Sequence, residues 1–210
     1  MVHYSQHKSW SAWTALLIGG IITAFIAVNV HSAAERAERR DVTTAQADIQ
    51  GKIMSRMALQ KYLLQSGAGL LEASDSVSRK EWFYFAESQE IHLNYPDVLG
   101  IGYARIIPGH LLENHTLEVR REGLTSYRVY PEGFRERYSS VIYLEPNSAR
   151  NLGVLGFDML SEPVRRAAME RAGDSHTVAL SGKVKLVQET DKDRQTGVLI
   201  YAPVYKKGMP

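Results

Sequence analysis

Several polar or aromatic residues sit within otherwise apolar stretches, and their types suit the recognition of a small molecule. A small-molecule pocket is usually an apolar cavity with a few well-placed hydrogen-bonding groups. For each residue taken alone, the alternative is an amphipathic core or rim position whose polar end contacts water. The candidates are Tyr103, Arg105, Tyr138, Tyr143, Ser181 and Tyr201.

The sequence shows no comparable arrangement for catalysis or for holding a metal. It has no cysteine, which excludes disulfides, thiolate nucleophiles and cysteine-ligated zinc. None of the seven histidines belongs to a His-Glu-x-x-His or similar pair, and no Gly-x-Ser-x-Gly or phosphate-binding glycine loop is present. The carboxylates are not paired as acid and base by the sequence. We therefore expect a binding module with no catalytic residue, no metal and no cofactor.

The charge distribution bears on the kind of partner. The net charge is +2 over 210 residues, and residues 67–210 carry 18 Lys or Arg and 19 Asp or Glu, which leaves that part at −1. Proteins that bind nucleic acid usually present a basic patch, and a near-neutral module lacks one. We expect no nucleic-acid partner. The length allows a membrane segment and one domain of about 150 residues.

An uncharged stretch near the N-terminus, residues 13–30, has the composition of a membrane-spanning helix. Its 18 residues would extend about 27 Å as a helix, close to the thickness of the bilayer core. Trp10 and Trp13 lie at its start, where interfacial aromatic residues are common. The alternatives are a cleavable signal peptide, with the small residues 32–34 as cleavage site, and a buried core helix. We expect an uncleaved anchor.

The orientation that we expect for this anchor departs from the positive-inside rule. Arg36, Arg39 and Arg40 follow the segment and only Lys8 precedes it, so the positive-inside rule favours export of the N-terminus. We nevertheless expect residues 1–12 to form a cytoplasmic tail, because the tail is very short and the segment looks like an export signal. The rest of the chain would then be periplasmic or extracellular and attached to the inner membrane.

Residues 31–78 predict a long stalk helix followed by a connection. Val42, Ile49, Ile53, Met57 and Leu64 recur at helical spacings up to about residue 65. Such a stalk could pair with a second copy or pack on its own domain, and the sequence leaves both open. We expect a homodimer that forms through the stalk helices. Residues 66–78 are expected to be a loop or a weakly helical connection.

The remaining residues, 79–210, predict an α+β domain in which a few helices accompany a mainly antiparallel sheet. Ser78 and Glu81 have the spacing of a capping box, and the helix they open should end near residue 94. A second helix is expected at 111–122, and a third should begin at Ser161 and end before Gly173. Strands are expected at 100–107, 139–146, 177–182, 184–189 and 198–205, with a polar hairpin loop at 190–197, and residues 126–133 are expected to form a strand and a turn.

Strand alternation divides the first strand into two faces. Gly100 and Gly102 lie on one face, and Ile101, Tyr103 and Arg105 share the other. The sequence leaves open which of the two faces borders a cavity.

Five blocks in this part of the chain together resemble a CHASE domain of the bacterial type. The resemblance covers roughly residues 80–210, and the preceding anchor and stalk suit the layout of the family. The blocks are YPDVLGIGYARIIP at 95–108, VIYLEP at 141–146, LGFDMLSEPVRRAAMERA at 155–172, ALSGKVKLVQE at 179–189 and GVLIYAPVY at 197–205.

The resemblance implies an extracytoplasmic sensor of transmembrane histidine kinases, as in two-component systems, or of nucleotide cyclases. Such a domain begins with a long stalk helix and carries PAS-like sheets, of which the membrane-distal one holds the ligand. Plant receptors of the family bind cytokinins, so a cytokinin-like or adenine-like ligand is implied by analogy. The complete domain would continue past Pro210 into a second PAS-like part, a second membrane crossing and an output such as a histidine kinase or diguanylate cyclase.

The resemblance also adds residues to the candidate site. Glu136 falls where an acidic residue hydrogen-bonds the ligand in the plant receptors, and Ser181 falls where those receptors have a threonine. Phe157 belongs to the family motif GFD at 156–158, whose Asp158 could instead cap the helix that follows. The alternative function is an anchored or secreted small-molecule binding protein without signalling output.

Overall fold

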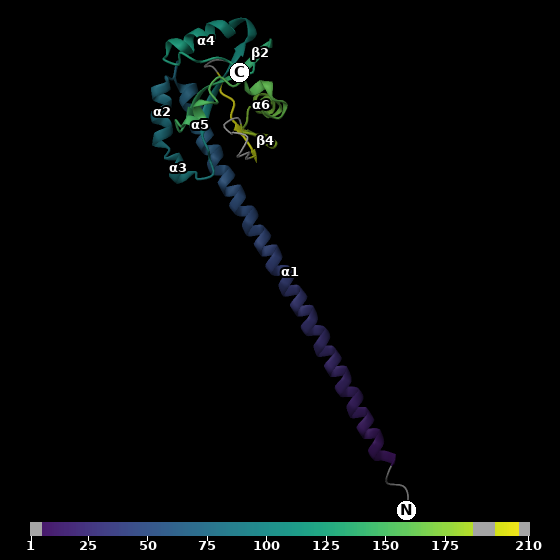
Figure 1. Cartoon of the computed structure of the whole chain (residues 1–210). Coiled ribbons are helices and arrows are strands. Elements are labelled where there is room, and N and C mark those ends of the chain that lie inside the picture. The colour runs from purple at the N-terminus through teal and green to yellow at the C-terminus, as the bar shows by residue number, and fades with distance from the viewer. Residues whose placement is uncertain (1–5, 187–195, 206–210) are drawn as a thin grey trace, which may run out of the picture. The chain divides into compact units, whose positions relative to one another are not determined.

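The computed structural model describes residues 6–186 and 196–205, with side chains described in these ranges apart from 6–12, 30 and 32–43. The chain divides into two compact units, Met1–Arg56 and Met57–Pro210. One helix, α1 (Gln6–Ala73), contributes to both (Figure 1).

In the first unit, α1 includes the range 13–30 that was predicted to cross a membrane. The large apolar side chains there are exposed, with Trp13 at 67% and Phe25 at 69%. In the part of the chain that the structure describes, no helix has the length and apolar character needed to span a membrane.

The second unit begins with the end of α1, which runs further than predicted. The helix expected up to about residue 65 is confirmed, but the connection expected at 66–78 is helical up to Ala73. Leu63 is 3% exposed, and Leu70 and Leu71 pack against the same core. Burial of this apolar face offsets the low helix propensity of the glycines in the segment.

Helix α2 (Arg79–Ser88) begins with the capping box that the sequence predicted. The Ser78 hydroxyl accepts from the Glu81 N–H at 3.2 Å, and the Glu81 carboxylate accepts from the Ser78 N–H at 2.7 Å. The expected continuation to residue 94 is wrong, because Glu90 takes a left-handed conformation with φ 46° and a separate turn, α3 (Ile91–Asn94), follows. This break accompanies the burial of Ile91, which is 6% exposed.

Two long strands, β1 (Ile101–Pro108) and β2 (Arg137–Glu145), pair in antiparallel fashion, as expected for 100–107 and 139–146. Tyr103 lies opposite Tyr143, and the register shifts by one residue between Tyr103 and Ala104. Gly102 allows a close approach, since a Cβ there would lie 2.6 Å from the Tyr143 carbonyl oxygen. The bulge and the glycine let β1 lie tightly along β2.

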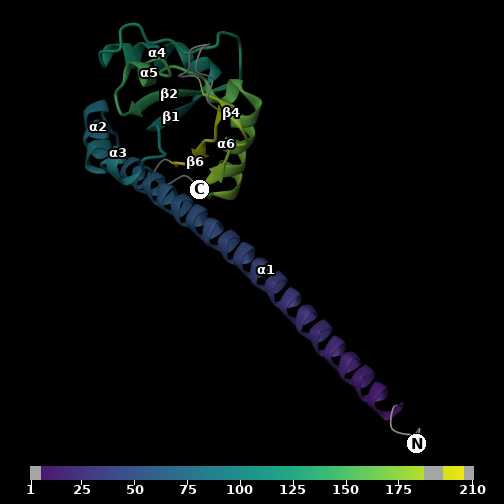
Figure 2. The same ribbon diagram turned by 60° about the horizontal axis from the view of Figure 1, so that its bottom comes forward.

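Helices cover this strand pair on more than one side. Figure 2 shows α2 and α6 on opposite sides of β1 and β2. Helix α4 (Leu112–Arg121) follows the short turn η1 (Gly109–Leu111), and Gly123 after it has φ 105°, as the predicted helix at 111–122 requires. The main core holds Leu63, Trp82, Ala86, Ile91, Ile101, Val119, Tyr127, Ile142 and Tyr143.

The predicted strand at 126–133 is wrong. Only Tyr130 of this segment forms a bridge, with Phe157, and the Tyr127 N–H closes a turn on the Leu124 carbonyl. Tyr127 is 4% exposed and belongs to the core, so packing of this ring sets the local backbone. Pro131 also removes one N–H that a strand ladder would use.

Helix α6 (Pro163–Ser175) starts and ends differently from the prediction. Its N-cap is Glu162, whose carboxylate accepts from the Val164 and Arg165 N–H groups. The expected cap, Ser161, donates its hydroxyl to the Asp158 carbonyl and closes the turn η2 (Met159–Ser161) instead. Gly173 lies inside α6, which ends at His176 in the left-handed region.

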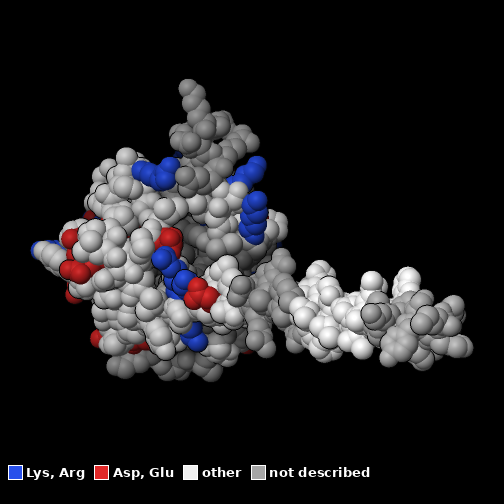
Figure 3. All heavy atoms as spheres, turned by 90° about the horizontal axis from the view of Figure 1, so that it is seen from below, with Lys and Arg blue, Asp and Glu red and all other residues white. Residues whose placement is uncertain are grey.

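The last strands are shorter than predicted and belong to two small sheets. β3 (Ala179–Leu180) pairs with β6 (Ile200–Tyr201), and β4 (Val184–Lys185) pairs with β5 (Thr196–Gly197). The expected hairpin loop at 190–197 therefore contains a strand at its end, and 187–195 lie outside the described residues. With α5 (Ala149–Leu152), these elements make an α+β fold with three two-stranded antiparallel sheets among the described residues. Figure 3 shows acidic and basic side chains interspersed on one face of this unit.

Candidate functional site

A large hollow lies beside β1 in the second unit. It has a volume of about 2700 Å³ and is lined by the end of α1, all of β1, parts of α2, α4 and α6, and the segment 196–205. Ligand pockets usually measure about 300–1,000 Å³. A small molecule would therefore occupy only part of this hollow.

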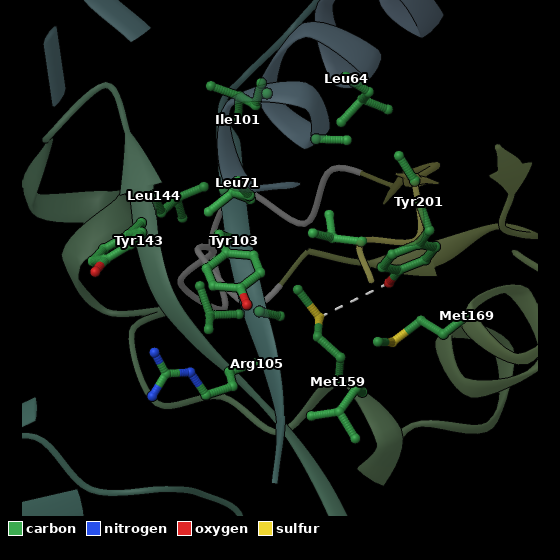
Figure 4. Close-up of a pocket in the computed structure, with 18 of the residues that line it drawn as sticks. Leu64, Leu71, Ile101, Tyr103, Arg105, Tyr143, Leu144, Met159, Met169 and Tyr201 are labelled. Atoms are coloured by element: carbon green, nitrogen blue, oxygen red, sulfur yellow. Dashed lines mark hydrogen bonds between the residues drawn. The ribbon is translucent and has the colours of Figure 1, made fainter. Parts of the chain in front are cut away.

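The walls of the hollow combine apolar side chains with polar and charged ones, and Figure 4 shows part of this lining. Leu64 and Leu71 come from α1, Ile101 from β1 and Leu144 from β2, while Met159 and Met169 come from η2 and α6. Thioether side chains adapt to ligands of different shape. Residues of both faces of β1 line the hollow, and Ile101, Tyr103 and Arg105 are among them.

Three of the predicted tyrosines line this hollow, namely Tyr103, Tyr143 and Tyr201, and the candidate Arg105 lines it as well. Tyr143 is 4% exposed and donates its hydroxyl to the Val77 carbonyl at 2.7 Å, so its polar end is used by the fold. The Tyr201 hydroxyl makes a long contact of 3.9 Å to the Met159 sulfur, and burial raises the pKa of Tyr201 to about 12. A phenol with that pKa is neutral at any physiological pH and can donate a hydrogen bond.

Tyr103 is the most available of the three. Its ring lies 6.5 Å from Trp82 and 6.1 Å from Tyr143, which fixes its position at the edge of the aromatic core. Its hydroxyl forms no hydrogen bond with any described residue. A half-buried hydroxyl with free donor and acceptor capacity suits contact with a ligand.

The other four predicted residues do not line the hollow. Glu136 is exposed in the segment before β2. Tyr138 is 4% exposed, and its hydroxyl donates to the Gly133 carbonyl at 2.8 Å and accepts from the Arg135 N–H at 2.9 Å. The Ser181 hydroxyl donates to the Gly182 carbonyl and accepts from the Leu199 N–H at 2.8 Å. Phe157 packs edge-on to Tyr130 and beneath the Arg165 guanidinium at 5.2 Å.

The GFD motif at 156–158 has a structural role beside β2. Asp158 is fully buried, and one carboxylate oxygen accepts from the Ser139 N–H at 2.7 Å and the Leu160 N–H at 3.1 Å. Arg135 approaches the other oxygen at 3.5 Å. Gly156 has φ 89°, and a Cβ there would clash with the Arg128 carbonyl oxygen. Asp158 therefore caps η2 and fixes it to β2, which was the second interpretation of the sequence.

A buried polar chain lies beneath α4, next to Arg105. The His115 Nε2 and the Tyr127 hydroxyl are 3.0 Å apart, and the Tyr127 hydroxyl and the Ser140 hydroxyl are 2.6 Å apart. Burial, and secondarily the positive Arg105, lower the pKa of His115 to about 4. The ring is therefore neutral at physiological pH, and its Nδ1 has no hydrogen-bond partner among the described residues.

Sequence reasoning did not place Met159, Met169, Arg165 or His115 at the site, although all four are buried or half-buried and line the hollow. Met159 directly follows the family motif GFD, and this position could have indicated that it belongs to the site. The other three lie on helices, where their spacing resembles ordinary core packing. Within the described ranges, no group of three His, Asp or Glu side chains is arranged to hold a metal ion.

The fold is α+β with a large hollow beside β1, and a comparison with protein families gives its class. The family model of the CHASE domain matches residues 75–210, so the chain belongs to the CHASE domain family. CHASE domains are extracellular sensor modules of signalling proteins. A search of curated proteins found no match to the chain.

Proposed function

We propose that this protein is a membrane-anchored extracytoplasmic sensor that binds a small molecule in the hollow beside β1 and passes the signal to an output domain. In this proposal the output is a histidine kinase or a diguanylate cyclase that lies outside this sequence. The observation that carries the proposal is the unbonded hydroxyl of Tyr103, which lies next to apolar side chains in the wall of the hollow of a CHASE domain.

A ligand in this position could act on the stalk, because both border the same space. Leu64 and Leu71 of α1 line the hollow together with Tyr103. A ligand shifts a conformational equilibrium only by binding one arrangement more tightly than the other. We propose that the small sheets belong to a PAS-like sensor and that two copies associate through their stalk helices. An adenine-like ligand, implied by the plant members of the family, is the first compound class to test.

The anchor in this proposal is the segment 13–30, which has no charged residue among its 18 positions. If it anchors the chain, the expressed protein stays in the membrane pellet after washing at alkaline pH and is released only by detergent. A variant with Ile18→Lys and Ile22→Lys should move to the soluble fraction. Release of the unmodified chain by the alkaline wash would contradict the anchor.

Binding is tested by thermal-shift screening of the full chain against purines and other small metabolites, both neutral and charged. For a compound that raises the melting temperature, Tyr103→Phe removes only the hydroxyl and should weaken binding about threefold to tenfold, the usual effect of one neutral hydrogen bond. Tyr84→Phe is the matched control, because Tyr84 is 58% exposed and lies outside the hollow. A screen without any stabilising compound would refute small-molecule sensing by this chain.

A further inference from the structure

We propose that the ligand of this hollow is an organic anion, whose carboxylate or phosphate group binds Arg105 and whose apolar part lies against the neighbouring wall. This inference rests on the proposed function and adds the chemical class of the ligand. It starts from Arg105, a cation on an otherwise apolar strand between Ala104 and Ile106.

The guanidinium of Arg105 has only a weak partner in the protein. Its ion pair with Glu118 of α4 has a separation of 3.6 Å, and the two side chains are 46% and 61% exposed. Exposed ion pairs of this kind contribute little to stability. Among the described residues no other carboxylate lies within ion-pair distance of Arg105. Exchanging Glu118 for the anionic group of a ligand would therefore cost the protein little.

The groups next to Arg105 suit the same ligand. Figure 4 shows Tyr103 and Arg105 following one another along β1 at the wall of the hollow. The free hydroxyl of Tyr103 can donate a second hydrogen bond to an anionic oxygen. His115, which also lines the hollow, is neutral at physiological pH and adds no competing charge.

The wall above these polar groups can hold the apolar part of the ligand. Leu64, Leu71 and Ile101 lie on the side of Tyr103 away from Arg105 in Figure 4. A molecule with an anionic end and a ring or short alkyl chain would satisfy both regions. Adenine itself lacks an anionic group, so this inference predicts a different class from the one implied by the plant receptors.

The experiment compares matched anionic and neutral compounds on the full chain by isothermal titration. Benzoate, phenyl phosphate and hexanoate are the anions, and benzamide, benzyl alcohol and hexanamide are the neutral counterparts. In the unmodified chain the anions should bind at least tenfold more tightly. Arg105→Gln should weaken the anions about tenfold to a hundredfold, the effect of losing a charged hydrogen bond, and leave the neutral compounds unchanged.

Two further variants exclude a general effect of charge. Arg121→Gln makes the same charge change at an exposed position of α4 outside the hollow and should leave anion binding unchanged. Glu118→Gln removes the competing carboxylate and should strengthen anion binding a few-fold. The comparison of benzoate with phenyl phosphate decides between a carboxylate and a phosphate group.

The outcomes separate this inference from the proposed function. Equal binding of anions and neutral counterparts, or anion binding that survives Arg105→Gln, overturns the anionic ligand and leaves small-molecule sensing intact. A neutral metabolite from the wider screen that binds the Arg105→Gln variant as well as the unmodified chain does the same. If no compound of either charge binds, the sensor proposal fails and this inference fails with it.

Discussion

Lowering the pH below about 6 should destabilise this domain through one buried histidine, His115. The ring is 4% exposed, and its Nδ1 has no hydrogen-bond partner among the described residues. Protonation would place a positive charge in this site, close to the positive Arg105, without an anion in direct contact. Desolvation is the main reason why the folded protein lowers the pKa of His115.

The size and the sign of the effect follow from the two pKa values. The pKa is about 6.5 in the unfolded chain and about 4 in the folded protein, so the unfolded chain binds the proton first as the pH falls. Each pH unit of this difference corresponds to about 1.4 kcal/mol, which gives about 3 kcal/mol in total. The contribution is present above pH 6.5, declines between about 6.5 and 4, and is lost below that. This is a large part of the 5–15 kcal/mol typical of a small domain.

The assay is urea unfolding of the full chain at pH 7 and at pH 4.5, followed by circular dichroism. His115→Gln removes the titrating ring and keeps a polar group that can hydrogen-bond Tyr127. The variant should be less stable than the unmodified chain at pH 7 and lose less stability between the two pH values. His92→Gln, at an exposed position of α3, is the matched control and should keep the unmodified pH dependence.

The reasoning is refuted if His115→Gln and the unmodified chain lose the same free energy of unfolding between pH 7 and pH 4.5. Other buried groups that titrate in this range are shared by the two proteins. Their contributions therefore cancel in the comparison, and the difference reports on His115 alone.

Three further substitutions test the packing that supports the site. Gly156→Ala should lower the free energy of unfolding by at least about 2 kcal/mol or prevent folding, because φ is 89° and the new Cβ would meet a backbone carbonyl. In the same urea assay, the control Gly69→Ala on the exposed side of α1 should be neutral or stabilising by up to about 1 kcal/mol. Burial raises the pKa of Glu145, so the folded state disfavours its ionised form. Glu145→Gln should therefore increase the free energy of unfolding at pH 7 but not at about pH 3. An equal effect at both pH values would contradict this cause. Asp158→Ala should cost about 3 kcal/mol, since it leaves two buried N–H groups without an acceptor, and a loss below about 1 kcal/mol would show that water replaces the carboxylate.

The elements that the sequence predicted correctly have local causes. The capping box of Ser78 and Glu81, the closing Gly123 of α4 and the apolar runs of β1 and β2 all act within a few residues. A local pattern is sufficient to identify such elements, because the interactions that form them join neighbours in the chain.

The errors have distant causes. The break at Glu90 and the missing strand at 126–133 both accompany burial of a residue, Ile91 and Tyr127, against elements far away in the chain. The cap of α6 differs from the prediction because the hydroxyl of Ser161 bonds the carbonyl of Asp158, whose own carboxylate is held by the distant Ser139 N–H of β2. A propensity read along the chain does not contain these contacts, since they depend on the assembled core.

The residues of the candidate site were likewise predicted only in part. The sequence identified Tyr103 and Tyr143 as polar groups on apolar strands, and the register of β1 and β2 puts them opposite each other. It gave no means to separate them from Tyr138 and Ser181, whose hydroxyls are used by a turn and by a neighbouring strand. That distinction requires knowing where each hydroxyl finds its partner in three dimensions.

A crystal structure of the full chain with the strongest compound from the binding screen tests the central claim most directly. We expect the ligand in the hollow beside β1, in contact with the Tyr103 ring or hydroxyl and within reach of Tyr201. A ligand bound instead at Glu136 and Ser181, outside the hollow, would contradict the site proposed for this CHASE domain.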